Sequence, residues 1–281
     1  MWDRDCGGGA LGQVWLRMIL RSLLLNDLTI DDEASFRHVA LYGRLKRALG
    51  ESRHRFRTAA AGERASWDRV LFLNLTFWSG ADESSVLCDE HIAPDVIAHT
   101  AWHHVVGKEL AHACPAGPPA AGALLFSEAI ASAFDLYLVG RLLTNAPTSD
   151  FIAGQLPIMA DAAEQAGLSQ AGFASLMDVV SANPERAFED MRALLVDAGR
   201  ALGACSDADQ AQGALEAFVG HRFEPLLHHF QLSNWILYAR AYARAPGADS
   251  DASEEVIRRW DQELRACPVS LDSLATRCLA D

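Results

Sequence analysis

Residues 96–110 read VIAHTAWHHVVGKEL, and the rest of the chain is interpreted outward from this stretch. Just before it, Pro94 and Asp95 are residue types that favour the first turn of an α-helix. His99 and His103 are four residues apart, and such positions differ by about 40° around a helix axis. The two imidazoles are therefore expected on one face of a helix, in line with Asp95.

A second stretch with chemical content follows at residues 127–138, which read SEAIASAFDLYL. It is a strongly apolar helical pattern that carries two carboxylates, Glu128 and Asp135. These are seven residues apart and so share a helical face. Ala131 and Ser132 lie between them, and small residues at that point let a second helix approach closely.

Together the two stretches contain the residue types of a zinc site. Two histidines one turn apart on a helix can reach the same metal ion, and neutral imidazole suits zinc in particular. A carboxylate from a second helix completes a His₂Glu ligand set. The sequence therefore predicts a zinc site with His99, His103 and Glu128 as ligands. Asp95 and Asp135 are predicted to support these ligands by hydrogen bonding.

This pattern resembles the gluzincin-type zinc metallopeptidases, in which an HExxH motif lies on one helix and a glutamate on a later helix is the third ligand. The matching residues are His99, His103 and Glu128, and the resemblance covers residues 96–138 only. Thr100 stands where the family has the glutamate that activates water, and threonine cannot act as a general base at neutral pH. Asp135 also lies farther from Glu128 than the corresponding family aspartate. The resemblance implies a zinc-binding scaffold whose hydrolytic activity is altered or lost.

Two alternatives use the same residues differently. Histidines on a helix with Trp and Val neighbours also suit a protein core, where each makes one hydrogen bond. The chain would then be a non-enzymatic helical interaction or regulatory protein. A second histidine-rich stretch, HRFEPLLHH at residues 221–229, favours a helix start with surface histidines. The less favoured interpretation of this stretch is a helical di-metal oxidase, because helix bundles can hold two iron ions with carboxylate and histidine ligands.

Composition predicts a globular protein that does not bind polyanions. The chain has 281 residues, of which 50% are apolar, and this is enough to bury a sizeable core. The formal net charge is −13, and the longest basic cluster is RLKR at residues 44–47. Nucleic acids and anionic membranes bind concentrated positive charge, so neither is an expected partner. A peptide or protein partner remains open.

The cysteines and the apolar runs predict a cytoplasmic location. Six cysteines are scattered singly without a CxxC pair, which suits free thiols in a reducing compartment. The N-terminal sequence lacks the pattern of a signal peptide, because Arg17 and Arg21 interrupt the apolar run at residues 14–25. No stretch reaches the roughly 18 charge-free apolar residues of a membrane span.

The predicted fold class is all-α, a multi-helix bundle with a small β-hairpin before the histidine-containing helix. The hairpin strands are expected at residues 73–79 and 86–88, which are rich in β-formers. Residues 52–61 are basic and are expected to be a surface segment. We predict one helical domain, residues 1–281, with flexible residues 1–12. Apolar periodicity and turn signals place helices at residues 13–25, 33–49, 63–75, 94–113, 122–143, 150–166, 169–182, 184–202, 208–219, 225–244 and 253–266.

Overall fold

The computed structural model describes residues 20–59, 84–87, 89–113, 120–242 and 250–279, and most of these are helical. An all-α multi-helix bundle with small strand pairs is therefore confirmed. The chain divides into two compact units, one formed by Met1–Thr29 and Arg53–Ile92 and the other by Ile30–Ser52 and Ala93–Asp281. A single helical domain remains a prediction. Residues 1–12, which were predicted to be flexible, lie outside the described residues.

The first unit contains the strands. β1 (Leu20–Leu24) pairs antiparallel with β3 (Arg55–Ala59), and β4 (Ser84–Leu87) lies parallel to β3. The backbone N–H of Thr29, where β2 (Thr29–Ile30) begins, donates to the carbonyl of Glu90 just before β5 (His91–Ile92). β4 overlaps the strand predicted at residues 86–88, whereas the strand predicted at 73–79 and the helix predicted at 63–75 lie outside the described residues.

Two predictions for this unit are wrong. Residues 20–25 were expected to end a helix, but Leu20–Leu24 is a strand and Leu25–Asp27 is the 3₁₀ helix η2. The basic segment at 52–61 contains β3, in which Phe56 and Thr58 are fully buried while the arginines alternate with them. The strand pairing between β1 and β3 overrides the helical periodicity of the first segment. Buried and exposed residues alternate along β3, as is typical of a strand, but the arginines made the segment look like an exposed surface loop in the sequence.

The second unit is helical. Its elements are η3 (Glu33–His38), α1 (Tyr42–Glu51), α3 (Pro94–Ala113), α4 (Ala121–Asn145), α5 (Asp150–Gln165), α6 (Gln170–Ala182), α7 (Pro184–Gly203), α8 (Ala208–Glu216), η5 (Glu224–Phe230), α9 (Leu232–Tyr242), α10 (Ser250–Ala266) and α11 (Ser270–Cys278). The helix expected at 33–49 is split by the extended residue Val39, and the one expected at 225–244 is split at Gln231, whose φ is 50°. α11 was not predicted.

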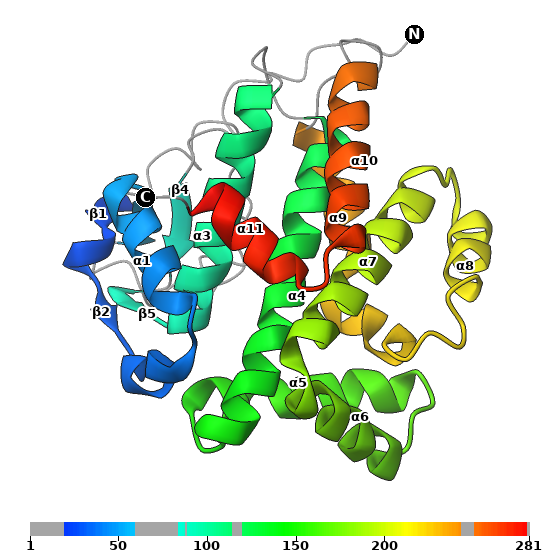
Figure 1. The fold of residues 1–281 in the computed structure, drawn as a ribbon, viewed down its shortest axis with the longest axis horizontal. Helices are drawn as coiled ribbons and strands as arrows, with labels where there is room; N and C mark the ends of the chain where they lie inside the picture. The colour runs from blue at the N-terminus through cyan, green and yellow to red at the C-terminus, as the bar shows by residue number, and fades with distance from the viewer. Residues whose placement is uncertain (1–19, 60–83, 88, 114–119, 243–249, 280–281) are drawn as a thin grey trace, which may run out of the picture. The chain divides into compact units, whose positions relative to one another are not determined.

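α4 is the central helix of this unit, and it packs against α3, α5, α6, α7, α9 and α10 (Figure 1). Its residues from Phe126 to Phe134 are all buried, which is possible because they are apolar or small except for Glu128. Gly140 brings α4 against the start of α7, since a Cβ there would lie 2.7 Å from the carbonyl oxygen of Val180 and 3.1 Å from Pro184 Cβ. The apolar sequence of α4 thus reflects its place in the core.

α4 is also, among the described residues, the helix that is long and apolar enough to cross a membrane. In the structure, 78% of its most apolar window is buried inside the protein. A buried core helix of a soluble protein passes the same test of length and composition, so this feature is weak evidence for a membrane span.

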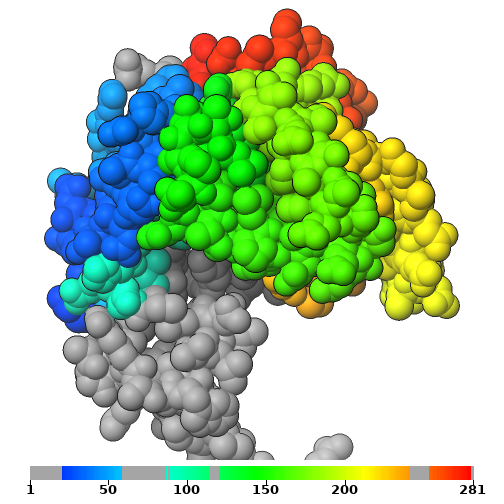
Figure 2. All heavy atoms as spheres, turned by 90° about the horizontal axis from the view of Figure 1, so that it is seen from below, coloured from blue at the N-terminus to red at the C-terminus, as the bar shows by residue number. Residues whose placement is uncertain are grey.

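Contacts between η3 and α5 close one side of the helical unit. The rings of Phe36 and Phe151 meet edge to face, with centroids 5.9 Å apart. The carboxylate of Asp32 accepts a hydrogen bond of 3.0 Å from the backbone N–H of Asp150, the first residue of α5. In the space-filling view, the blue residues of this early segment adjoin the green residues of α4 and α5 (Figure 2). This arrangement fixes the loop that precedes α1 against the N-terminus of α5.

Candidate metal centre

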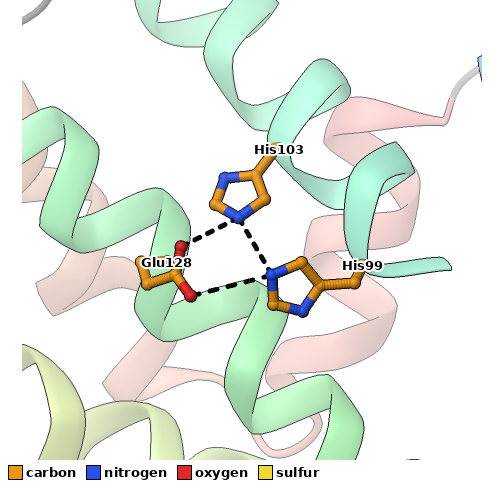
Figure 3. A group of neighbouring side chains, drawn as sticks. All are labelled: His99, His103 and Glu128. Carbon is orange, nitrogen blue, oxygen red and sulfur yellow. Dashed lines mark hydrogen bonds and ion pairs between the residues drawn. The ribbon is translucent and has the colours of Figure 1, made fainter. Parts of the chain in front are cut away.

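Three side chains from two helices converge in the helical unit (Figure 3). His99 and His103 project from α3, and Glu128 projects toward them from α4. The Nε2 atoms of the two histidines are 3.1 Å apart. Glu128 Oε2 lies 2.9 Å from His103 Nε2, and Glu128 Oε1 lies 3.6 Å from His99 Nε2. These three residues, which the sequence predicted as ligands, can hold a metal ion.

The separations between the donor atoms fit a tetrahedral metal ion. Zinc binds histidine nitrogen and carboxylate oxygen at about 2.0–2.2 Å, so two ligands at a tetrahedral angle are about 3.4 Å apart. The two histidine nitrogens are 3.1 Å apart, and each has one carboxylate oxygen of Glu128 near it, Oε2 at 2.9 Å from His103 and Oε1 at 3.6 Å from His99. With one donor atom from each residue, the three atoms all lie within 4.8 Å of one another. Glu128 is also only 5% exposed, and a carboxylate buried that deeply needs a charged or hydrogen-bonded partner. Both the geometry and the burial therefore suit a bound cation.

Hydrogen bonds on the far side of each ring orient the two histidines. His99 Nδ1 lies 3.0 Å from Asp135 Oδ2, and His103 Nδ1 lies 3.0 Å from Ser127 Oγ. A carboxylate only accepts hydrogen bonds, so Asp135 assigns the proton of neutral His99 to Nδ1 and leaves the Nε2 lone pair directed at the site. Ser132 Oγ donates a hydrogen bond of 3.2 Å to Glu128 Oε1.

The structure thus places Asp135, but not Asp95, in hydrogen-bonding contact with a ligand. Within the described residues, Asp95 makes no hydrogen bond to His99; it lines a cavity of about 200 Å³ with Asp31, Asp32 and Asp150 among others. Burial, together with the nearby charge of Asp135, raises the pKa of Asp95 to about 6. Asp95 therefore contributes to the negative potential around His99.

Sequence reasoning missed Ser127 as a partner of His103. The signal was present, because Ser127 directly precedes Glu128 on α4 and one helix can direct neighbouring residues toward the same partner helix. Serine is common in apolar helices, so only the position of α3 against α4 shows what its hydroxyl contacts.

The carboxylates around the site control the protonation of His99 in the metal-free protein. Burial lowers the pKa of His99, but the charge and hydrogen bond of Asp135, with the charges of Glu128 and Asp95, outweigh it and raise that pKa to about 9. Burial raises the pKa of Glu128, but His103, His99 and the Ser132 hydroxyl together bring it below its usual value. The metal-free site therefore holds its positive charge on histidine near neutral pH.

A pH dependence follows from the raised pKa of His99. Because the pKa of about 9 in the folded protein exceeds the unfolded value near 6.5, protonated His99 stabilises the metal-free fold fully below about pH 6.5. That contribution is lost as the pH rises through 9. A metal ion must displace this proton, so zinc affinity is expected to rise about 10-fold per pH unit from pH 6.5 toward 8.5.

Zinc competition titrations at pH 6.5, 7.5 and 8.5 measure this dependence. In an Asp135→Asn variant the slope is expected to flatten, because Asp135 is the main cause of the raised pKa of His99. A zinc affinity that stays constant over this range in the unsubstituted protein would contradict the expected competition between the proton and the metal.

The other residues considered for the site do not join it. Thr100, which stands at the position of the family's general base, is 8% exposed on the inner side of α3. Glu109 acts on Cys278 of α11 through its charge, and not on the histidine pair. Among the described residues, His99, His103 and Glu128 form the one group of three potential metal ligands. In this part of the chain, residues 221–229 do not form a group of three potential metal ligands.

Comparison with protein-family models, with curated proteins and with solved structures finds no match to this chain. Functional interpretation therefore rests on the residues of the site and on their geometry. The group formed by His99, His103 and Glu128 does not by itself assign the chain to the gluzincins.

Proposed function

We propose that this protein binds one zinc ion through His99, His103 and Glu128. The observation that carries the proposal is the direction of the two imidazoles. Both Nδ1 atoms face hydrogen-bonding partners, Asp135 and Ser127, which turns both Nε2 atoms toward each other and toward the buried carboxylate. Partners of this kind on the outer ring nitrogen are typical of metal-bound histidines.

We further propose a zincin-like protein whose hydrolytic chemistry is altered or lost. Three protein ligands leave a fourth position on zinc, which is the arrangement of catalytic sites, whereas structural sites are closed by four. When bound, zinc polarises a carbonyl or phosphoryl oxygen and makes water more acidic. On the chain itself, Asp135 holds the Nδ1 proton of His99, and Thr100 offers no base beside it. A substrate would thus be bound and polarised without the family's proton acceptor.

A second candidate is a helical interaction or regulatory protein with structural histidines. It is favoured by the contact of 2.9 Å between His103 Nε2 and Glu128 Oε2, because an imidazole N–H can donate a hydrogen bond to a buried carboxylate without a metal. The raised pKa of His99 supports the same arrangement at neutral pH. In this case α3 and α4 would be joined by a buried charged network.

Metal analysis of the purified chain separates the two candidates. We expect one zinc per chain, retained on dialysis and lost in a His99→Ala variant. A His112→Ala variant is the matched control, because this histidine is exposed near the end of α3 and lies away from the site. A chain that takes up no zinc after exposure to the metal would overturn the proposal and leave the structural role of the histidines.

A further inference from the structure

A small cavity lies beside Asp135. Its volume is about 10 Å³, and its polar lining consists of Asp135, His229 and Gln155, from α4, η5 and α5. Leu136, Val139, Phe151, Met159 and Phe230 form the apolar part of the wall. About 10–15 Å³ is the space that one water molecule requires. The cavity is therefore of the size of a single buried water.

Two residues that line this cavity each have a buried polar atom without a hydrogen-bond partner among the described residues. One such atom is Oδ1 of Asp135, the oxygen that does not bond to His99, and the other is Nδ1 of His229. Leaving a buried polar atom unsatisfied costs about 1–3 kcal/mol, so buried water usually occupies such places. Buried waters typically make two to four hydrogen bonds, and the amide of Gln155 is a third available group.

We infer that His229 is a positioning residue of the proposed metal site, acting through one water bound between its Nδ1 and Oδ1 of Asp135. This water donates one hydrogen to the carboxylate and either donates its other hydrogen to Nδ1 or accepts the Nδ1 proton. The inference rests on the proposed zinc function, because the hydrogen bonds that run from His229 through the water and Asp135 end on the ligand His99.

A hydrogen bond from the bridging water to Asp135 would restrict the rotation of its carboxylate. Asp135 is 31% exposed, so its carboxylate could rotate if only the bond to His99 held it. A second hydrogen bond on Oδ1 fixes the plane of the carboxylate and thereby the direction of the His99 ring. Loss of a hydrogen-bonding partner behind a metal ligand weakens metal binding by about 10–100-fold. His229 acts one step farther out, so its loss should fall at the lower end of this range.

Zinc competition titrations on His229 variants test the inference. His229→Phe keeps the ring volume but removes Nδ1, and we expect zinc to bind about 10-fold more weakly. His229→Asn places an amide near the position of Nδ1 and should restore most of the affinity. The matched control is His228→Phe, because His228 is the exposed neighbour on η5. If His229→Phe does not fold, as judged by circular dichroism, His229→Ala replaces it in the comparison.

A double-variant cycle shows whether Asp135 transmits the effect. In an Asp135→Asn background, which itself weakens zinc binding, adding His229→Phe should cost nothing more, because the path is already broken. An equal loss in both backgrounds, or unchanged affinity in His229→Phe, would overturn the inference.

Nuclear magnetic resonance of the metal-free protein separates this inference from the proposed function. The ring nitrogen shifts of His99 should change in His229→Phe and remain unchanged in His228→Phe. If the unsubstituted chain binds no zinc, the zinc proposal fails, but these shifts still decide whether His229 positions Asp135. Unchanged His99 shifts in both variants would overturn the link from His229 to His99.

Discussion

Glu128→Gln is expected to abolish stoichiometric zinc binding while the helical content of the protein stays unchanged. A neutral amide oxygen is a poor zinc ligand, whereas carboxylate oxygen and imidazole nitrogen are the usual ones. With two ligands left, the affinity should fall by more than the roughly 10–100-fold that removing a hydrogen-bonding partner costs. Glutamine fills the same volume and can still accept the hydrogen bond from Ser132, so α3 and α4 should remain packed.

The effect is measured as zinc stoichiometry and as the shift in melting temperature on adding zinc. A ligand at 100 times its dissociation constant stabilises a protein by about 2.7 kcal/mol, and this stabilisation should vanish in Glu128→Gln. Glu109→Gln is the matched control, because Glu109 is a partly buried carboxylate of α3 whose charge acts on Cys278 and is not among the charges that act on His99. Equal zinc stabilisation in Glu128→Gln and the unsubstituted protein would exclude Glu128 as a ligand.

The same substitution tests the metal-free site. The charge of Glu128 helps to keep His99 protonated, so its removal should lower the pKa of His99 from about 9. A drop in this pKa together with loss of zinc binding would indicate that one carboxylate serves both states of the site. The proton on His99 and the metal ion would then compete for the same site between α3 and α4.

The site could be predicted because its residues lie on long, regular helices. α3 begins at Pro94 as expected, and the spacing of His99 and His103 gives their common face directly. Glu128 could be predicted as a ligand because a carboxylate buried in so apolar a helix needs a partner. What periodicity does not provide is the rotation of one helix against the other. The partner Ser127 and the different location of Asp95 both depend on that rotation.

The parts that sequence reasoning missed depend on contacts between distant segments. β1 forms because residues 20–24 pair with residues 55–59, and neither segment identifies the other by composition. The break at Gln231 uses a left-handed backbone, which few residues other than glycine adopt, so no turn signal marked it. His229 was likewise interpreted as part of a surface cluster, although it faces the cavity beside Asp135. Local patterns predicted the helices well, and tertiary contacts decided these exceptions.

A buried charged network between α7 and α10 should carry a large share of the stability of the helical unit. Arg192 of α7 is fully buried, and its guanidinium donates to Asp261 of α10 at 2.7 Å and to Glu189 at 2.7 Å. Asp261 is 5% exposed and also accepts from Arg200 and Arg265. The pKa of Asp261 is lowered, because the hydrogen bonds and charges of the arginines outweigh its burial. Two helices are thus joined through one carboxylate.

Asp261→Ala is therefore expected to destabilise the protein by about 3–5 kcal/mol, the cost of leaving one member of a buried ion pair without its partner. Chemical denaturation measures this loss, with Glu263→Ala as the matched control on the same helix. The Glu263 side chain is 53% exposed and pairs with Arg277, so its removal should cost less than about 1 kcal/mol. Similar losses in both variants would contradict a special role for the buried network.

The lowered pKa of Asp261 gives the same prediction a pH signature. A carboxylate whose pKa is lower in the folded protein stabilises it above the unfolded value near 3.9, and this contribution disappears as the pH falls through the folded pKa. The difference in stability between the unsubstituted protein and Asp261→Asn should therefore shrink on acidification below about pH 4. A difference that stays constant into acid would mean that packing around Asp261, and not its charge, joins α7 to α10.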